Sequence, residues 1–178
     1  MKKAEIKDLI GSSIEPRRLC RVFFKYDFNY RYYFPLAISD KLFLGANEDD
    51  FIIDGFSIRR FCDVKRVEIK DDKCLEIIKS EGVLEKIHVP QINITDWHSV
   101  FSSLAEMDYN IIVERESLIY DECEFAIGKI DKVLKTKVFF KHFDADGIWQ
   151  DDCYEIPYSQ ITSVTFASRY VDVFSKYV

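Results

Sequence analysis

The pattern of hydrophobic and polar positions predicts β-strands along most of the chain. In residues 64–70, Val67 and Ile69 alternate with charged side chains, which is the two-residue period of a half-buried strand. Similar patterns predict strands at 19–26, 31–38, 41–44, 51–53, 56–60, 74–78, 83–89, 109–113, 125–134, 137–143, 148–156, 161–167 and 170–174. Asp54-Gly55 and residues 144–147 have the composition of tight turns between strands.

Only two segments show the longer period of an α-helix. Trp97, Val100, Phe101 and Leu104 lie at i, i+3, i+4 and i+7, which predicts an amphipathic helix over 95–107. Thr95 is the expected N-cap of this helix, and at this spacing Trp97 is interpreted as a core residue. A second, short helix is expected at 4–10 and ends at Gly11-Ser12-Ser13.

Composition supports the strand pattern. Ile, Val, Phe, Tyr and Trp together make up 61 of the 178 residues, whereas Ala, Leu and Met make up 19. β-branched and aromatic side chains fit a pleated, half-buried surface better than a helix. The fold class predicted is therefore mainly β (α+β).

The two halves of the chain show a weak internal repeat. At an offset of 97 residues Phe43 matches Phe140 and Val67 matches Val164. The other matched pairs are Phe61 with Tyr158, Val64 with Ile161, Ile69 with Phe166 and, at an offset of 96, Leu75 with Val171 and Ile77 with Val173. The repeat favours duplication of a small β unit, although ordinary strand composition could produce the same pattern.

This repeat predicts a particular domain organisation. We expect an N-terminal β module with a short helix at 1–92, a connecting amphipathic helix at 93–108 and a C-terminal β module at 109–178. Each module would be a small β-barrel or a sheet that packs on the other module.

Two segments carry a resemblance to known proteins. Residues 43–72, beginning FLGANEDDFIIDG, and residues 128–177, beginning GKIDKVLKTKVFF, resemble uncharacterised bacterial proteins with tandem Sm-like or SH3-like small barrels. No catalytic motif accompanies that resemblance. Sm-like proteins bind RNA through loop residues in ring assemblies, but their RNA-contacting motifs are not matched here residue by residue.

Charge and cysteine content limit the partners and the cellular location that the sequence predicts. The net charge of −6 argues against a generally basic nucleic-acid binder, although residues 1–39 hold eight basic and four acidic side chains. The five cysteines are odd in number and widely spaced, which favours free thiols in a cytoplasmic protein. The sequence contains no apolar run long enough for a signal peptide or a membrane span, so no membrane association is expected.

The sequence offers little for catalysis or metal binding. Asp144-Ala145-Asp146-Gly147 resembles part of a calcium loop, but the twelfth position is Cys153 where a bidentate glutamate is required. The three histidines are widely separated, and the acidic pairs lie at expected turns. We therefore expect no cofactor, no metal and no enzymatic activity.

One segment combines aromatic and basic residues at unusual density. Eight of the twelve residues in 23–34 are aromatic, and arginines and lysines lie beside and among them. Burial of the rings, a protein-binding patch and single-stranded nucleic-acid binding are three interpretations of that pattern. The candidate contact residues are Arg17, Arg18, Arg21, Lys25, Tyr26, Tyr30, Arg31, Tyr32 and Tyr33.

The resulting hypothesis is a non-catalytic, intracellular binding or regulatory protein that acts through a protein partner. The alternative is an Sm-like module that binds single-stranded RNA or DNA. A homodimer formed through an exposed edge strand is a third arrangement that the sequence leaves open. The surface hypothesis fails if Tyr26, Tyr30, Tyr32 and Tyr33 are all fully buried.

Overall fold

The protein is mainly β, as the sequence predicts, and its contacts divide it into two compact units. In the computed structural model, residues 1–26, 29–119 and 122–178 are described. Unit 1 comprises Met1–Pro90 and unit 2 comprises Gln91–Val178.

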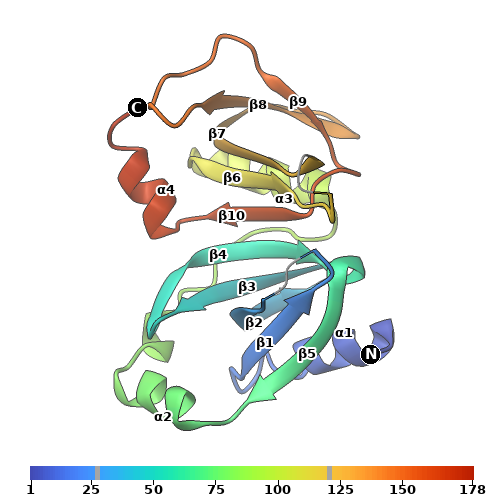
Figure 1. Cartoon of the computed structure of the whole chain (residues 1–178), viewed down its shortest axis with the longest axis vertical. Coiled ribbons are helices and arrows are strands. Elements are labelled where there is room, and N and C mark those ends of the chain that lie inside the picture. Colours follow the sequence, from blue (N-terminus) through green and yellow to red (C-terminus); the bar gives the residue numbers. More distant parts are fainter. Residues whose placement is uncertain (27–28, 120–121) are drawn as a thin grey trace. The chain divides into compact units, whose positions relative to one another are not determined.

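Unit 1 holds an antiparallel set of five strands in the order β5-β1-β2-β3-β4 (Figure 1). Its elements are α1 (Lys3–Gly11), β1 (Leu19–Phe24), β2 (Arg31–Ile38), β3 (Leu42–Asp49), β4 (Ile52–Arg60), a 3₁₀ turn η1 (Phe61–Asp63), β5 (Val64–Lys70), α2 (Lys73–Ser80) and a second 3₁₀ turn η2 (Leu84–Lys86). Helix α1 packs on β2 and β5 and contributes Ile6 and Ile10 to a core with Val22, Phe24 and Phe43.

Unit 2 holds five antiparallel strands in the order β10-β6-β7-β8-β9. Its elements are α3 (Trp97–Met107), β6 (Ile111–Arg115), β7 (Glu124–Val133), β8 (Lys137–Phe143), β9 (Tyr154–Pro157), β10 (Ser163–Phe166) and α4 (Arg169–Phe174). The predicted helical stripe is confirmed, because Trp97, Val100, Phe101 and Leu104 are all buried and α3 packs on β7 and β8.

The two units share one strand order. In each, a helix precedes the first strand, the fifth strand pairs with the first, and a short helix follows. Matched positions of the repeat lie on corresponding elements: Phe43 and Phe140 are on the third strands and have no exposed surface. Leu75 and Val171 are both buried in the helices that follow the fifth strands.

The strands predicted at 74–78 and 170–174 are wrong, because these residues lie in the helices α2 and α4. Each helix is short and begins at a capping residue: the Asp72 side chain accepts from the Leu75 amide, and the Ser168 side chain accepts from the Val171 amide. In α2 the buried pair is Leu75 and Ile78, at helical spacing, while Ile77 is exposed. Alternation of apolar residues over five positions was too short a signal to exclude a helix.

One turn prediction and two further strand predictions also differ from the structure. Asp54-Gly55 is not a hairpin turn but part of β4, where the pairing shifts opposite Ala46 and Glu48, and the chain turns at Asp50-Phe51. Residues 83–89 form η2 and irregular chain, and β9 covers only the end of the strand predicted at 148–156. The expected turn at 144–147 is confirmed by the Gly147 amide, which donates to the Asp144 carbonyl.

The N-cap of α3 is Asp96, where the sequence favoured Thr95. The Asp96 side chain accepts from the Ser99 amide at 2.8 Å, whereas Thr95 Oγ1 donates to the Asn93 side chain. We expect Asp96→Ala to lower the free energy of unfolding by about 1 kcal/mol, since an orphan amide of the first turn loses its acceptor. Urea titration would measure this change, with Thr95→Ala as the control, expected to change stability by less than about 0.5 kcal/mol. Equal effects of the two substitutions would contradict the assignment.

Candidate functional site

Only part of the predicted contact set comes together on one surface. Arg21, Tyr30 and Tyr32 are in mutual contact, and Tyr30 is 41% exposed. Tyr33 lies in the core and is therefore left out of the candidate surface, and Phe28 lies outside the described residues.

The remaining members serve other contacts. The Arg17 side chain donates to the Leu84 carbonyl at 2.7 Å, which fastens the chain before β1 to η2. Lys25 and Tyr26 contact the buried Asp63. Arg18 and Arg31 are exposed at the starts of β1 and β2.

We call the surface cluster of Arg21, Phe23, Tyr30, Tyr32, Arg66 and Glu68 the arginine–tyrosine stack. The Arg21 guanidinium carbon lies 4.3 Å from the Tyr30 ring centroid and 5.4 Å from that of Tyr32. Its Nη2 also donates to the Tyr32 hydroxyl at 2.7 Å. Each such cation–π contact is worth about 0.5–1 kcal/mol at an exposed site.

Strand pairing builds this stack. Arg21 on β1 is directly opposite Tyr32 on β2 and Glu68 on β5. Since side chains alternate between the faces of a strand, Phe23 shares the Arg21 face and pairs with Arg66, whose guanidinium lies 4.0 Å from the Phe23 ring centroid. The neighbouring positions Cys20, Val22 and Phe24 point into the core instead. The stack thus covers three adjacent strands on the face opposite the core.

Glu68 balances the two arginines of the stack. Its carboxylate lies 3.5 Å from Arg21 Nη1 and 2.9 Å from Arg66 Nη1. The hydrogen bond to the Tyr32 hydroxyl, with smaller electrostatic contributions from Tyr32, Tyr30 and Glu68, raises the pKa of Arg21 despite partial desolvation. Arg21 is therefore held by partners on both neighbouring strands, and Arg66 by Glu68 of its own strand and Phe23 of β1.

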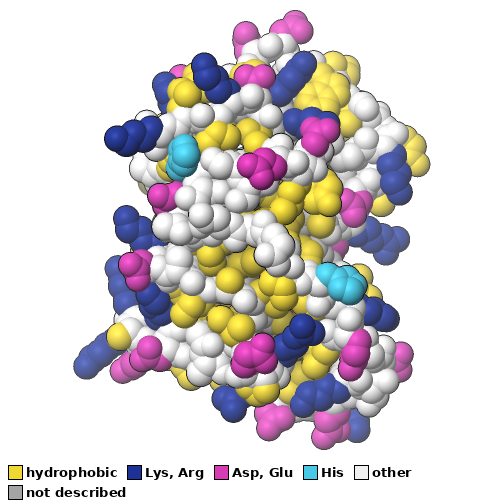
Figure 2. All heavy atoms as spheres, turned by 180° about the vertical axis from the view of Figure 1, so that it is seen from behind, with side chains coloured by type: hydrophobic (Ala, Val, Ile, Leu, Met, Phe, Trp, Pro, Cys, Tyr) yellow, Lys and Arg dark blue, Asp and Glu magenta, His cyan; other side chains and the backbone are white. Residues whose placement is uncertain are grey.

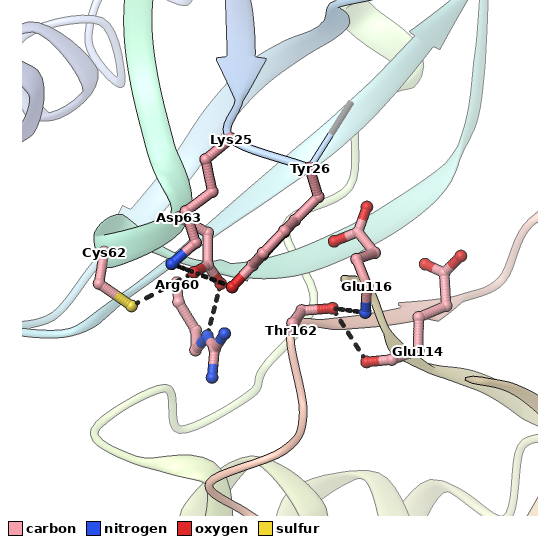
Figure 3. A network of polar contacts seen from close by, with 8 residues as sticks. All are labelled: Lys25, Tyr26, Arg60, Cys62, Asp63, Glu114, Glu116 and Thr162. Atoms are coloured by element: carbon pink, nitrogen blue, oxygen red, sulfur yellow. Dashed lines mark hydrogen bonds and ion pairs between the residues drawn. The ribbon is translucent and has the colours of Figure 1, made fainter. Parts of the chain in front are cut away.

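A buried carboxylate, that of Asp63 in η1, lies beside the end of β1 (Figure 3). Asp63 has no exposed surface, and its oxygens contact Arg60 Nε at 2.5 Å, Lys25 Nζ at 2.9 Å and the Tyr26 hydroxyl at 3.2 Å. Cys62 Sγ completes the group at 3.6 Å. Burial raises the pKa of Asp63, but the hydrogen bonds and charges of Arg60 and Lys25 outweigh it, so the pKa is lowered overall.

In unit 2, hydrogen bonds of the Thr162 side chain connect the end of β6 to the chain just before β10. Thr162 Oγ1 accepts from the Glu116 amide at 3.0 Å and donates to the Glu114 carbonyl at 3.1 Å (Figure 3). These bonds satisfy backbone groups where the pairing of the two strands begins. They indicate a structural role.

Sequence reasoning missed Arg66 and Glu68 as members of the surface, and it missed Asp63 altogether. The alternation in 64–70 placed Arg66 and Glu68 on one face of a strand. That signal could not reveal which strand lies beside it, because antiparallel register depends on contacts distant in sequence.

Within the described ranges, no group of three or more histidine, cysteine, aspartate or glutamate side chains lies close enough together to hold a metal ion. All five cysteines are free thiols, and burial raises the pKa of Cys20 to about 11. No helix among the described residues is long and apolar enough to cross a membrane. Acidic and basic side chains are interspersed on the face shown in Figure 2, with hydrophobic side chains between them.

Comparison with known proteins adds no family to this description. No family model, no curated protein and no solved structure matches the chain.

Proposed function

We propose that the chain is a non-catalytic binding protein that recognises a protein partner through the arginine–tyrosine stack. The observation that carries the proposal is the exposed Tyr30 ring, which contacts Arg21, Phe23 and Tyr32. Tyrosine and arginine dominate the residues that contribute most to protein–protein affinity.

Preorganisation adds to that argument. Binding costs side-chain entropy, and flexible arginines are among the residues that lose most. Arg21 is already held by Tyr32 and Glu68, so little further ordering is required when a partner covers it. Tyr30 and Tyr32 are in turn held at 5.1 Å between ring centroids.

A protein partner is favoured over single-stranded RNA or DNA. The Glu68 carboxylate contacts both arginines of the stack. A phosphate that bound these arginines would either displace this carboxylate or lie beside its negative charge. The net charge of −6 further disfavours a polyanion. Nucleic acid is accordingly one outcome of the test below.

The test is capture of partners from the native host by the tagged full chain, with and without nuclease. We expect Tyr30→Ala to reduce capture at least roughly tenfold, since removing a dominant contact costs about 2 kcal/mol or more. Tyr109→Ala is the matched control, because Tyr109 is exposed to a similar extent but lies in unit 2.

Capture that Tyr30→Ala leaves intact would overturn the proposal. Capture lost on nuclease treatment, with binding to oligonucleotides that weakens steeply with salt, would establish the nucleic-acid alternative instead. Light scattering on the purified chain tells whether the partner is a second copy of the protein, and Tyr30→Ala would then shift that assembly to monomer.

We further propose that the two units are copies of one small β module of the Sm-like or SH3-like kind. Their common strand order and the matched burial of Phe43 with Phe140 support this origin. The five unpaired thiols support a reducing, cytoplasmic setting for the protein.

A further inference from the structure

A pocket of about 220 Å³ lies beside the arginine–tyrosine stack in unit 1. Tyr32 belongs to both features. The lining of the pocket includes Tyr32, Glu48, Asp49, Asp50, Phe51 and Cys74. This volume is below the roughly 300–1,000 Å³ of pockets that take whole small molecules, so a single side chain suits it better.

The lining combines hydrophobic and acidic surface. The rings of Tyr32 and Phe51 provide the apolar surface, since Leu19 is almost fully buried and presents little of it. Four of the lining residues are acidic and one, Lys70, is basic. Lys70 already pairs with Asp72 at 2.5 Å, which leaves Glu48, Asp49 and Asp50 as the acidic side of the pocket.

Of these three carboxylates, Glu48 gives the clearest evidence that the pocket favours a cation. It is partly buried, and its Oε1 accepts the Phe51 amide at 2.9 Å. Burial raises the pKa of Glu48, the hydrogen bond from Phe51 lowers it, and the neighbouring charges of Asp49 and Asp50 raise it further. A cation that enters the pocket would offset the desolvation cost of the charged Glu48 carboxylate and reduce its repulsion by Asp49 and Asp50.

Phe51 is held beside this carboxylate in an unfavourable backbone conformation. Its φ is 70° and that of Asp50 is 45°, in the left-handed region that bulky residues avoid. The ring is 39% exposed. The turn therefore presents an aromatic surface at the pocket at a cost of backbone strain.

We propose that this pocket binds an arginine side chain of the protein partner. The methylene stem would pack on the rings of Tyr32 and Phe51, and the guanidinium would meet Glu48, Asp49 and Asp50. Arginine is favoured over lysine because a planar guanidinium stacks on rings and donates to carboxylates in pairs. The inference rests on the proposed function, since the pocket and the stack share Tyr32 and would be covered by one partner.

Cys74 provides the readout for a test on the full-length protein. Its thiol is exposed and lines the pocket, whereas the exposed thiol of Cys62 does not and serves as an internal control. Alkylation of each cysteine by iodoacetamide is followed by peptide mass spectrometry. The probe is Nα-acetyl-arginine amide, and its neutral analogue Nα-acetyl-citrulline amide is the matched control.

We expect the arginine probe to slow alkylation of Cys74 saturably and to leave Cys62 unchanged, and we expect the citrulline probe to slow neither. The double substitution Glu48→Gln and Asp49→Asn should raise the half-saturating probe concentration roughly tenfold, because it removes charge-assisted hydrogen bonds. Glu48→Gln alone provides a second variant in case the double variant fails to fold.

Absent protection, equal protection by citrulline amide, or unchanged protection in the folded variants would each overturn the inference. These failures are distinct from failure of the proposed function. If the pocket fails while Tyr30→Ala still abolishes partner capture, the stack remains the binding surface and the partner does not insert an arginine beside it.

Discussion

Asp63→Ala is expected to lower the free energy of unfolding by about 3–5 kcal/mol, the range seen when one partner of a buried ion pair is removed. Asp63 has no exposed surface and accepts from Arg60, Lys25 and Tyr26. Its loss would leave Arg60, which is 18% exposed, without a carboxylate that offsets its desolvation. The end of β1, the end of β4 and η1 would lose the group that connects them.

Urea denaturation followed by circular dichroism would measure the effect of Asp63→Ala. Asp71→Ala is the matched control, because Asp71 is an exposed aspartate of the same unit. It should change stability by less than about 0.5 kcal/mol. Comparable midpoints for the two variants would show that the Asp63 network contributes little to folding.

The same network predicts a pH dependence. The pKa of Asp63 is lowered in the folded protein, so its contribution is complete above the unfolded pKa of about 3.9 and is lost as pH falls through the folded value. The stability difference between wild type and Asp63→Asn should therefore narrow as pH falls below about 4. A difference that stays constant or widens in acid would contradict the lowered pKa.

Phe43→Ala and Phe140→Ala are each expected to destabilise the protein by about 3–5 kcal/mol, as for large aromatic side chains removed from a packed core. Both rings have no exposed surface and lie on the third strand of their unit. Phe43 contacts the rings of Tyr33 and Phe61 at 5.8 Å and 5.4 Å between centroids. The cavity that alanine leaves would remove these contacts along with the buried area.

Hydrogen exchange measured by mass spectrometry would show where in the chain each substitution destabilises the protein, and by how much. Exchange should rise first in peptides of unit 1 for Phe43→Ala and in peptides of unit 2 for Phe140→Ala. Phe125→Ala is the control, since that ring is 54% exposed and its loss should cost far less. A large effect at only one of the two matched positions would contradict their equivalence.

The success of sequence reasoning depended on the length of each pattern. Four apolar residues at helical spacing correctly predicted the buried face of α3, and the alternation in 64–70 correctly predicted β5. Shorter segments failed where side-chain capping decided the outcome, as with Asp72 before α2. Tyr30 and Tyr33 could not be distinguished as surface and core residues by composition, because they are the same residue type in one aromatic-rich segment.

The amino-acid sequence by itself determined that this chain is rich in strands, that it contains one strong amphipathic helix, and that its halves match at Phe43 and Phe140. These properties follow from local periodicity and from burial of apolar area, which short stretches of sequence encode. The arginine–tyrosine stack, the Asp63 network and the pocket beside Tyr32 depended on tertiary structure. Strand register and turn geometry bring Arg21 to Glu68, and Glu48 to Phe51, and neither is encoded in the spacing of residues along the chain.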